Sequence, residues 1–142
     1  MPNSSHTSNQ IQYVSSFQEL ISSPFSGETN AICWTRNLIG DFSEIANKIT
    51  LNENIVVLEQ DELKALQLSE KGQLAREIIL NDLQLLEAQG ASPSLNVIKC
   101  YEKDDSNSFF STDVYSFHVD RSPIPTNTFL CTYYGTSSEI IP

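Results

Sequence analysis

DELKALQLSEKGQLAREIILNDLQLLEAQG, residues 61–90, is the stretch that decides the fold. Its apolar residues recur near helical spacing with charged residues between them, and this pattern predicts an amphipathic helix. The apolar set comprises Leu63, Leu66, Leu74, Ile78, Leu83 and Leu86. Gly72 marks a point of interruption, and Gly90 followed by Pro93 ends the helix. The charged residues among the leucines are expected to form a solvated face.

Shorter elements precede this helix. Residues 13–26 and 38–49 carry apolar side chains at helical spacing, so each stretch predicts a short helix. Residues 31–34 and 55–58 are short apolar runs, and we expect both to be strands. Helices therefore dominate the first two thirds of the chain.

After the long helix the pattern becomes β-rich. Residues 95–101, 114–120 and 128–134 are each rich in β-branched and aromatic residues and predict three strands. Helices followed by an antiparallel set of strands are typical of an α+β fold. We therefore expect N-terminal helices packed on an antiparallel sheet, which would be part of an incomplete double-stranded β-helix, the jelly roll of some oxygenases.

The chain of 142 residues is long enough for one domain with a modest core. Residues 1–12 are polar and are expected to form a disordered tail, which leaves residues 13–142 as a single α+β domain. This domain is expected to be incomplete at its C-terminus, because the chain stops directly after its most β-prone segment.

The composition limits the classes of partner. With 8 Lys and Arg against 18 Asp and Glu, the formal charge of -10 repels phosphate backbones and anionic lipid. We therefore expect no nucleic-acid and no membrane partner. A cation, such as a divalent metal ion, or a basic protein surface suits the chain better. The N-terminus has no signal-peptide pattern and no apolar run approaches a membrane span, so a cytoplasmic location is expected.

Three widely spaced cysteines, Cys33, Cys100 and Cys131, lie among apolar or aromatic neighbours. Small thiols in such settings are typical of a protein core, so we expect them to be buried, reduced and too far apart to form disulfides. A metal or redox role for these thiols is the alternative.

One pair of residues points to specific chemistry. His118 and Asp120 lie two positions apart in a predicted strand, so both side chains are expected on one face, where an imidazole and a carboxylate can bind one metal ion. Non-haem iron sites use two histidines and one carboxylate, so His118 and Asp120 are half of such a site. The other histidine, His6, lies in the polar tail. A strand-end histidine hydrogen-bonded to its neighbouring aspartate is the alternative interpretation.

Other residues could complete this site. Arg121 follows the pair directly, and Tyr133 lies on the next predicted strand, so both are candidate substrate-binding residues. A Gly-x-Ser-x-Gly motif is absent, and the five glycines are scattered, so the sequence favours neither a serine nucleophile nor nucleotide binding.

The segment Phe117-His118-Val119-Asp120, followed by Phe129-Leu130-Cys131-Thr132-Tyr133-Tyr134-Gly135, resembles the signature of domain-of-unknown-function family 1826. Trp34-Thr35-Arg36 is similar to the Trp-x-Arg near the start of such proteins, and Glu139 matches their Glu-bearing tail. The resemblance spans about residues 30–142.

Members of this family carry a further histidine near their C-terminus, and this chain ends before that position. The resemblance therefore implies a C-terminally truncated member, with the missing metal ligand lying beyond Pro142. Some members are associated with zinc-homeostasis gene neighbourhoods, and the family has no established reaction. Metal handling or metal-dependent chemistry is therefore what the resemblance implies.

Three hypotheses follow. In the first, His118 and Asp120 bind Fe(II) in the N-terminal part of a non-haem iron oxygenase-like enzyme. In the second, the chain is an accessory protein linked to Zn(II), which binds without catalysis. In the third, it is an inactive fragment. Substrate, metal identity, reaction type and oligomeric state do not follow from the sequence.

Overall fold

The computed structural model describes residues 10–99 and 123–137. The chain divides into two compact units, which are described separately below: residues 1–38 with 138–142, and residues 39–137. Within the described ranges, each helix is too short or too polar to cross a membrane.

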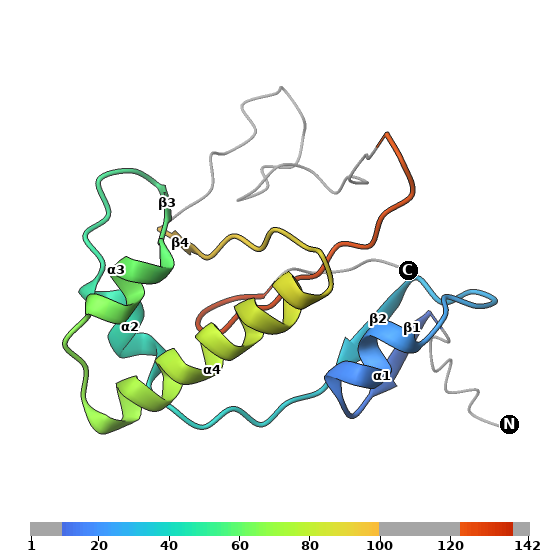
Figure 1. Cartoon of the computed structure of the whole chain (residues 1–142), viewed down its shortest axis with the longest axis horizontal. Coiled ribbons are helices and arrows are strands. Elements are labelled where there is room, and N and C mark those ends of the chain that lie inside the picture. The colour runs from blue at the N-terminus through green and yellow to red at the C-terminus, as the bar shows by residue number, and fades with distance from the viewer. Residues whose placement is uncertain (1–9, 100–122, 138–142) are drawn as a thin grey trace, which may run out of the picture. The chain divides into compact units, whose positions relative to one another are not determined.

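The first unit contains a strand–helix–strand arrangement (Figure 1). β1 (Ile11–Val14) pairs in parallel with β2 (Ala31–Trp34), and α1 (Phe17–Ser22) connects them. The helix begins after Ser16 because the Ser16 hydroxyl accepts a hydrogen bond from the backbone N–H of Glu19 at 3.1 Å. The predicted helix over 13–26 is therefore shorter than expected, and its first residues belong to β1.

An aromatic contact holds α1 against β2 in the first unit. The rings of Phe17 and Trp34 lie 6.2 Å apart between centroids, in a tilted arrangement. The Arg36 guanidinium lies 4.1 Å from the centroid of the Trp34 ring, a cation–π contact. The predicted strand over residues 31–34 is confirmed.

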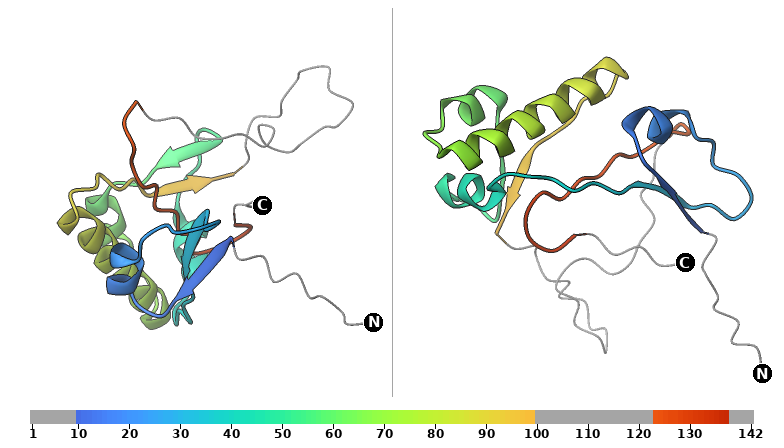
Figure 2. Two further views of the ribbon diagram at one scale, coloured as in Figure 1. Left: turned by 90° about the vertical axis from the view of Figure 1, so that its right-hand side faces the viewer. Right: turned by 90° about the horizontal axis from the view of Figure 1, so that it is seen from below.

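Within its described residues, the second unit contains three helices and a strand pair. α2 (Phe42–Lys48), α3 (Gln60–Ala65) and α4 (Glu70–Ala88) lie close together (Figure 1). β3 (Ile55–Val57) pairs antiparallel with β4 (Asn96–Ile98), and the two arrows lie side by side in the left view of Figure 2. The strand predicted over 55–58 is therefore confirmed in shorter form. The strand predicted over 95–101 is confirmed at Asn96–Ile98, and its last two residues lie outside the described part of the chain.

The core of the second unit forms around one face of α4. Among the described residues, the buried hydrophobic side chains are Phe42, Ile45, Leu58, Leu63, Ala75, Ile79 and Leu83. The α4 members recur at spacings of four residues, as one helix face requires. Leu74, which the sequence pattern assigned to the apolar face, is 46% exposed because the buried face of α4 is centred one residue later, on Ala75.

The predicted long helix is in fact two helices, with the break at residues 66–69 and not at Gly72. Ser69 caps α4, since its hydroxyl accepts from the backbone N–H of Gly72 at 3.1 Å. The guanidinium of Arg76 donates to the carbonyls of Lys64 at 3.0 Å and Leu66 at 2.9 Å, near the end of α3. These contacts satisfy carbonyls that the end of α3 leaves open.

A second contact ties the start of α4 to α2. The carboxylate of Glu44 accepts from the backbone N–H of Ser69 at 2.9 Å and from its hydroxyl at 2.6 Å. Lys48 forms an ion pair with the same carboxylate at 3.1 Å and also donates to the carbonyl of Gln67. The Glu44–Ser69 clamp, as we name these contacts, thus fixes the loop that separates α3 from α4.

The backbone at Gly40 and Asp41, which leads into α2, passes very close to α4. A Cβ atom added at Gly40 would lie 2.7 Å from the backbone nitrogen of Ala75, and Gly40 has a φ of +154°. The next residue, Asp41, donates its backbone N–H to the carbonyl of Lys71 at 2.9 Å. Only glycine fits here without displacing the backbone.

The last part of the fold differs from prediction. Residues 128–134, expected as a strand, have no regular secondary structure, and the expected strand over 114–120 lies outside the described residues. The described part is mixed α+β, with two small sheets, one parallel and one antiparallel, and no closed barrel within those ranges. The α+β class is thus confirmed.

Replacing Gly40 with alanine should lower the free energy of unfolding by about 3 kcal/mol, because a side chain there meets backbone and the φ is unfavourable for an L-residue. Gly90→Ala is the matched control: its φ of +82° is also positive, but nothing lies within 4 Å. It should lose only about 1 kcal/mol. Urea unfolding of both variants tests this, and equal losses would contradict the close approach.

The Glu44–Ser69 clamp predicts a specific acid sensitivity. Hydrogen bonds from Ser69, aided by Lys48, lower the pKa of Glu44 from 4.5 to about 2, although burial opposes this. The folded state therefore holds fewer protons than the unfolded state as pH falls from 4.5 toward 2. The stabilisation of the folded state by the ionised Glu44 carboxylate is complete above pH 4.5, and it is lost as the pH falls from 4.5 to about 2.

Glu44→Gln should therefore have a lower urea midpoint than the parent chain at neutral pH, and the two midpoints should converge as the pH approaches 2. Glu77→Gln removes the same charge from an exposed position on α4 and should leave the midpoint almost unchanged throughout. A gap between Glu44→Gln and the parent that stays constant with pH would show that the carboxylate charge does not stabilise the clamp.

Candidate functional site

The residues predicted to bind metal fall outside the described part of the chain. His118, Asp120 and Arg121 lie between residues 100 and 122, and His6 lies in the N-terminal range that is likewise not described. Their roles therefore stay predictions. Tyr133 is described, and it is the residue from which a site can be built.

Tyr133 lies in the irregular segment 123–137, where nearly every side chain is exposed. Its hydroxyl donates to the Oδ2 atom of Asp82 on α4 at 2.7 Å. Its ring stacks on Phe42 of α2, with centroids 5.4 Å apart and planes inclined by 13°. Tyr133 therefore inserts between two helices and anchors a segment that forms no strand pairing of its own.

Asp82 is the partner that the sequence analysis missed. It is only 8% exposed, which is unusual for a carboxyl group, and buried carboxyl groups need hydrogen-bond partners. A signal was present in the sequence: Asp82 follows Ile79 by three residues and Ala75 by seven, so it lies on the buried face of α4. The assignment of all charged residues in this helix to a solvated face is wrong at this position.

The surroundings of Tyr133 keep its hydroxyl protonated. Burial, together with the hydrogen bond to Asp82 and the nearby Cys131 thiol, raises the pKa of the Tyr133 phenol far above its usual value. The phenol is therefore a neutral hydrogen-bond donor across the physiological range, and neither a base nor a nucleophile. This group of three residues, Asp82, Cys131 and Tyr133, is the candidate site within the described residues.

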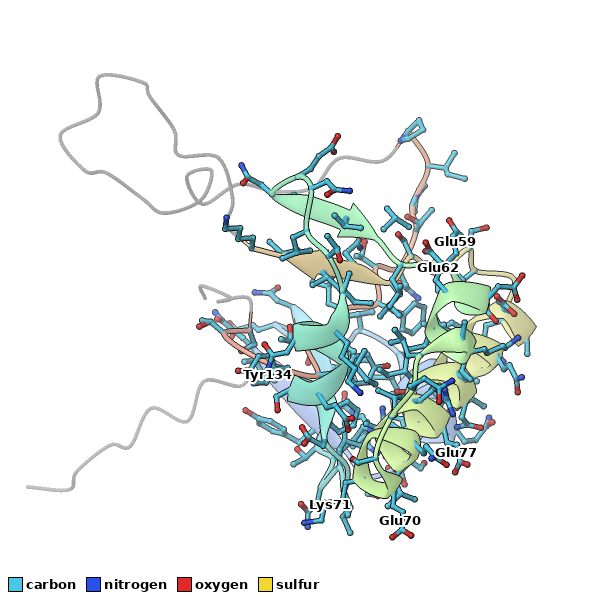
Figure 3. All side chains as sticks on the ribbon, turned by 90° about the vertical axis from the view of Figure 1, so that its left-hand side faces the viewer. Glu59, Glu62, Glu70, Lys71, Glu77 and Tyr134 are labelled. Carbon is cyan, nitrogen blue, oxygen red and sulfur yellow. The ribbon has the colours of Figure 1, made fainter. Side chains whose placement is uncertain are left out.

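What this site can do follows from its geometry. The Tyr133 hydroxyl proton is directed at Asp82, so a substrate would have to replace that carboxyl group to receive it. The predicted substrate-binding role of Tyr133 therefore stays a prediction, whereas its contacts assign it an anchoring role. Tyr134 is 60% exposed and lies on the outer surface in Figure 3.

The cysteines differ from expectation in one respect. Cys33 and Cys131 are not joined in a disulfide, and both are exposed, so the prediction of buried core thiols is wrong for these two. Cys33 lies on a short strand that keeps one face open, and Cys131 lies in the irregular segment. Cys100 lies outside the described residues.

The remaining polar surface supports the solvated-face interpretation. Figure 3 shows Glu59, Glu62, Glu70, Lys71 and Glu77 around the outside of the second unit, and all five are exposed. In the portion of the chain that the structure describes, histidine, cysteine, aspartate and glutamate side chains form no group of three or more that could hold a metal ion. The exposed acidic residues of α3 and α4 therefore form a charged surface.

Tyr133→Phe should lower the free energy of unfolding by about 1–2 kcal/mol, because the ring stacking persists while the buried Asp82 carboxyl loses a donor. Tyr134→Phe, one residue later, removes a hydroxyl from an exposed ring and is the matched control. Urea unfolding at neutral pH should separate the two variants. If both were as stable as the parent chain, Tyr133 would not be an anchor.

No family model, curated protein or solved structure is significantly similar to this chain. The resemblance to domain-of-unknown-function family 1826 is thus neither supported nor contradicted by these comparisons. The function has to be argued from the residues themselves.

Proposed function

We propose that this chain binds a divalent metal ion through His118 and Asp120. The single observation that carries the proposal is the spacing in Phe117-His118-Val119-Asp120, which in an extended chain directs an imidazole and a carboxylate to the same side. These are two of the three ligands of a facial iron site, and both also bind zinc.

Two observations support this proposal. A metal site of three or more ligands must include residues outside the described ranges, since no such group occurs within them, and both histidines of the chain lie there. The formal charge of -10 also favours the approach of a cation over that of an anion.

Within this proposal, oxygenase-type chemistry on Fe(II) requires a second imidazole beside His118 and Asp120. A double-stranded β-helix would hold such a triad on a rigid sheet, so we propose this jelly roll as the architecture of the complete site. Arg121, next to the carboxylate ligand, is the residue proposed to bind an anionic substrate group. Without a second imidazole, the same pair supports a zinc-linked accessory role without turnover.

Titration of the purified chain with Fe(II) or Zn(II), followed by calorimetry, tests the proposal. Binding should be weak, because two ligands leave most of the coordination sphere to water. His118→Ala and Asp120→Asn should each reduce the affinity at least about tenfold, since even loss of a ligand's hydrogen-bond partner changes metal affinity by about 10–100-fold. Binding should also weaken as pH falls below about 6.5, where histidine becomes protonated.

The chain provides matched controls for both ligands. His6→Ala removes the other histidine, and Asp104→Asn removes another carboxylate from the same part of the sequence. Neither should change the affinity. If His6→Ala weakened binding as much as His118→Ala, or if His118→Ala had no effect, the proposed ligand set would be wrong.

A further inference from the structure

Tyr133 occupies a slot that two helices border. Its ring stacks on Phe42 of α2, with centroids 5.4 Å apart and planes inclined by 13°. Its hydroxyl donates to the Oδ2 atom of Asp82 on α4 at 2.7 Å. Phe42 is 9% exposed and Asp82 is 8% exposed, so both bordering side chains are buried. The slot, as we name the space bordered by Phe42 and Asp82, thus presents one flat apolar surface and one hydrogen-bond acceptor.

The segment that carries Tyr133 buries little else. Residues 123–137 have no regular secondary structure, and within this range only Phe129 and Tyr133 are not exposed. Segments with few buried contacts open at a low cost in free energy. The buried residues Ile45 of α2 and Ile79 of α4 come from the helices themselves. The two helices are therefore expected to keep the slot in place when the segment detaches.

We propose that the slot is a binding site for phenols, in which Tyr133 is a tethered ligand that another phenol can displace. Stacking on Phe42 selects a planar aromatic ring, and the Asp82 carboxyl group selects a ring that carries a hydroxyl donor. The ligand is a small-molecule phenol or the tyrosine side chain of another polypeptide, since both have this chemistry. Its binding would release residues 123–137 from α4.

The slot favours a neutral hydroxyl over a phenolate. Burial, followed by the hydrogen bond to Asp82, raises the pKa of the Tyr133 phenol far above its usual value. A phenolate would bring a negative charge into this buried position, which costs free energy. The expected ligands are therefore phenols that stay protonated at neutral pH. One such ligand is p-cresol, which has the ring, hydroxyl and first carbon of the tyrosine side chain.

Calorimetric titration of the full chain with p-cresol and toluene tests the proposal, with Tyr133→Ala as the variant that vacates the slot. This variant should bind p-cresol about tenfold more tightly than toluene, because both rings can stack on Phe42 but only p-cresol donates to Asp82. The parent chain should bind p-cresol at least about tenfold more weakly than Tyr133→Ala. Its own ring has to leave first, and tethering gives that ring an effective concentration in the millimolar range.

Two further variants identify the acceptor. Asp82→Leu, introduced into the Tyr133→Ala chain, removes the carboxyl group but keeps a branched side chain, so p-cresol and toluene should then bind alike. Glu77→Leu in the same chain is the matched control, because Glu77 is an exposed residue of the same helix. It should leave the preference for p-cresol unchanged.

A peptide with the sequence of residues 128–137 distinguishes the two sources of the phenol. If a polypeptide can supply the ligand, the peptide should bind to the Tyr133→Ala chain. Its affinity should fall about tenfold when the peptide carries Tyr133→Phe and should not change when it carries Tyr134→Phe. Binding of p-cresol without binding of the peptide would support the site with a small-molecule phenol as its ligand.

Several results would overturn the proposal. Tyr133→Ala could bind neither ligand, or both equally, or its preference for p-cresol could survive Asp82→Leu. Equal binding of p-cresol by the parent chain and by Tyr133→Ala would place the ligand elsewhere. Binding of the peptide without binding of p-cresol would show that the chain recognises the segment and not the phenol.

The test also covers a Tyr133→Ala chain that circular dichroism shows to be unfolded. In a stabilising osmolyte, a ligand of the folded state shifts this variant toward that state. p-Cresol should then restore the native spectrum at a lower concentration than toluene. Restoration by neither ligand, or by both at the same concentration, would overturn the proposal. The slot shares no residue with the proposed metal ligands His118 and Asp120, so this result and that of the metal titration are independent.

Discussion

The second unit depends on how closely other segments approach α4. A small residue stands at two of the tightest points: Gly40 lies against the backbone of Ala75, and Gly72 lies against the carboxylate of Glu44. Because neither glycine has a Cβ atom, α2 can pack closely against α4, and Phe42, Ile45, Ala75 and Ile79 are all buried. Burial of this face of α4 therefore depends on the two glycines as much as on the apolar side chains.

This constraint explains why polar contacts carry so much of the structure. Seven apolar side chains are buried among the described residues, and the free energy of unfolding of a domain is a narrow margin between large terms. The Glu44–Ser69 clamp and the Asp82–Tyr133 hydrogen bond act where apolar burial ends: one holds a loop between helices, and the other holds an irregular segment to α4. Both join residues far apart in sequence, so each restricts a long stretch of chain.

The sequence patterns predicted the elements that depend mainly on neighbouring residues in the chain. The strands at residues 31–34 and 55–58 were predictable from β-branched and apolar runs, and the helical character of 61–90 from leucine spacing. The break between α3 and α4, just before Ser69, could not be predicted from these patterns, because it depends on Glu44, a residue 25 positions earlier. The irregular form of residues 128–134 could not be predicted either, because Tyr133 in this segment is held by α4 and not by a neighbouring strand.

The candidate site was harder to predict, for the same reason. Tyr133 was predicted to bind substrate, yet its most specific contact is with Asp82, and only the three-dimensional structure pairs a residue of α4 with one 51 positions later. The burial of Asp82 could have been inferred from its place between Ile79 and Leu83. Its partner could not, since any tyrosine, serine or backbone N–H would satisfy a carboxyl group equally well.

Metal preference can be argued from donor chemistry. Thiolates favour zinc, whereas an imidazole and a carboxylate suit iron(II) and zinc alike. The two described cysteines are exposed, but neither joins a group of three potential ligands within the described ranges. The proposed pair, His118 and Asp120, supplies one nitrogen and one oxygen donor, so its metal selectivity has to come from the third ligand that joins it. A second imidazole would complete an iron-type triad, while a thiolate would shift the site toward zinc.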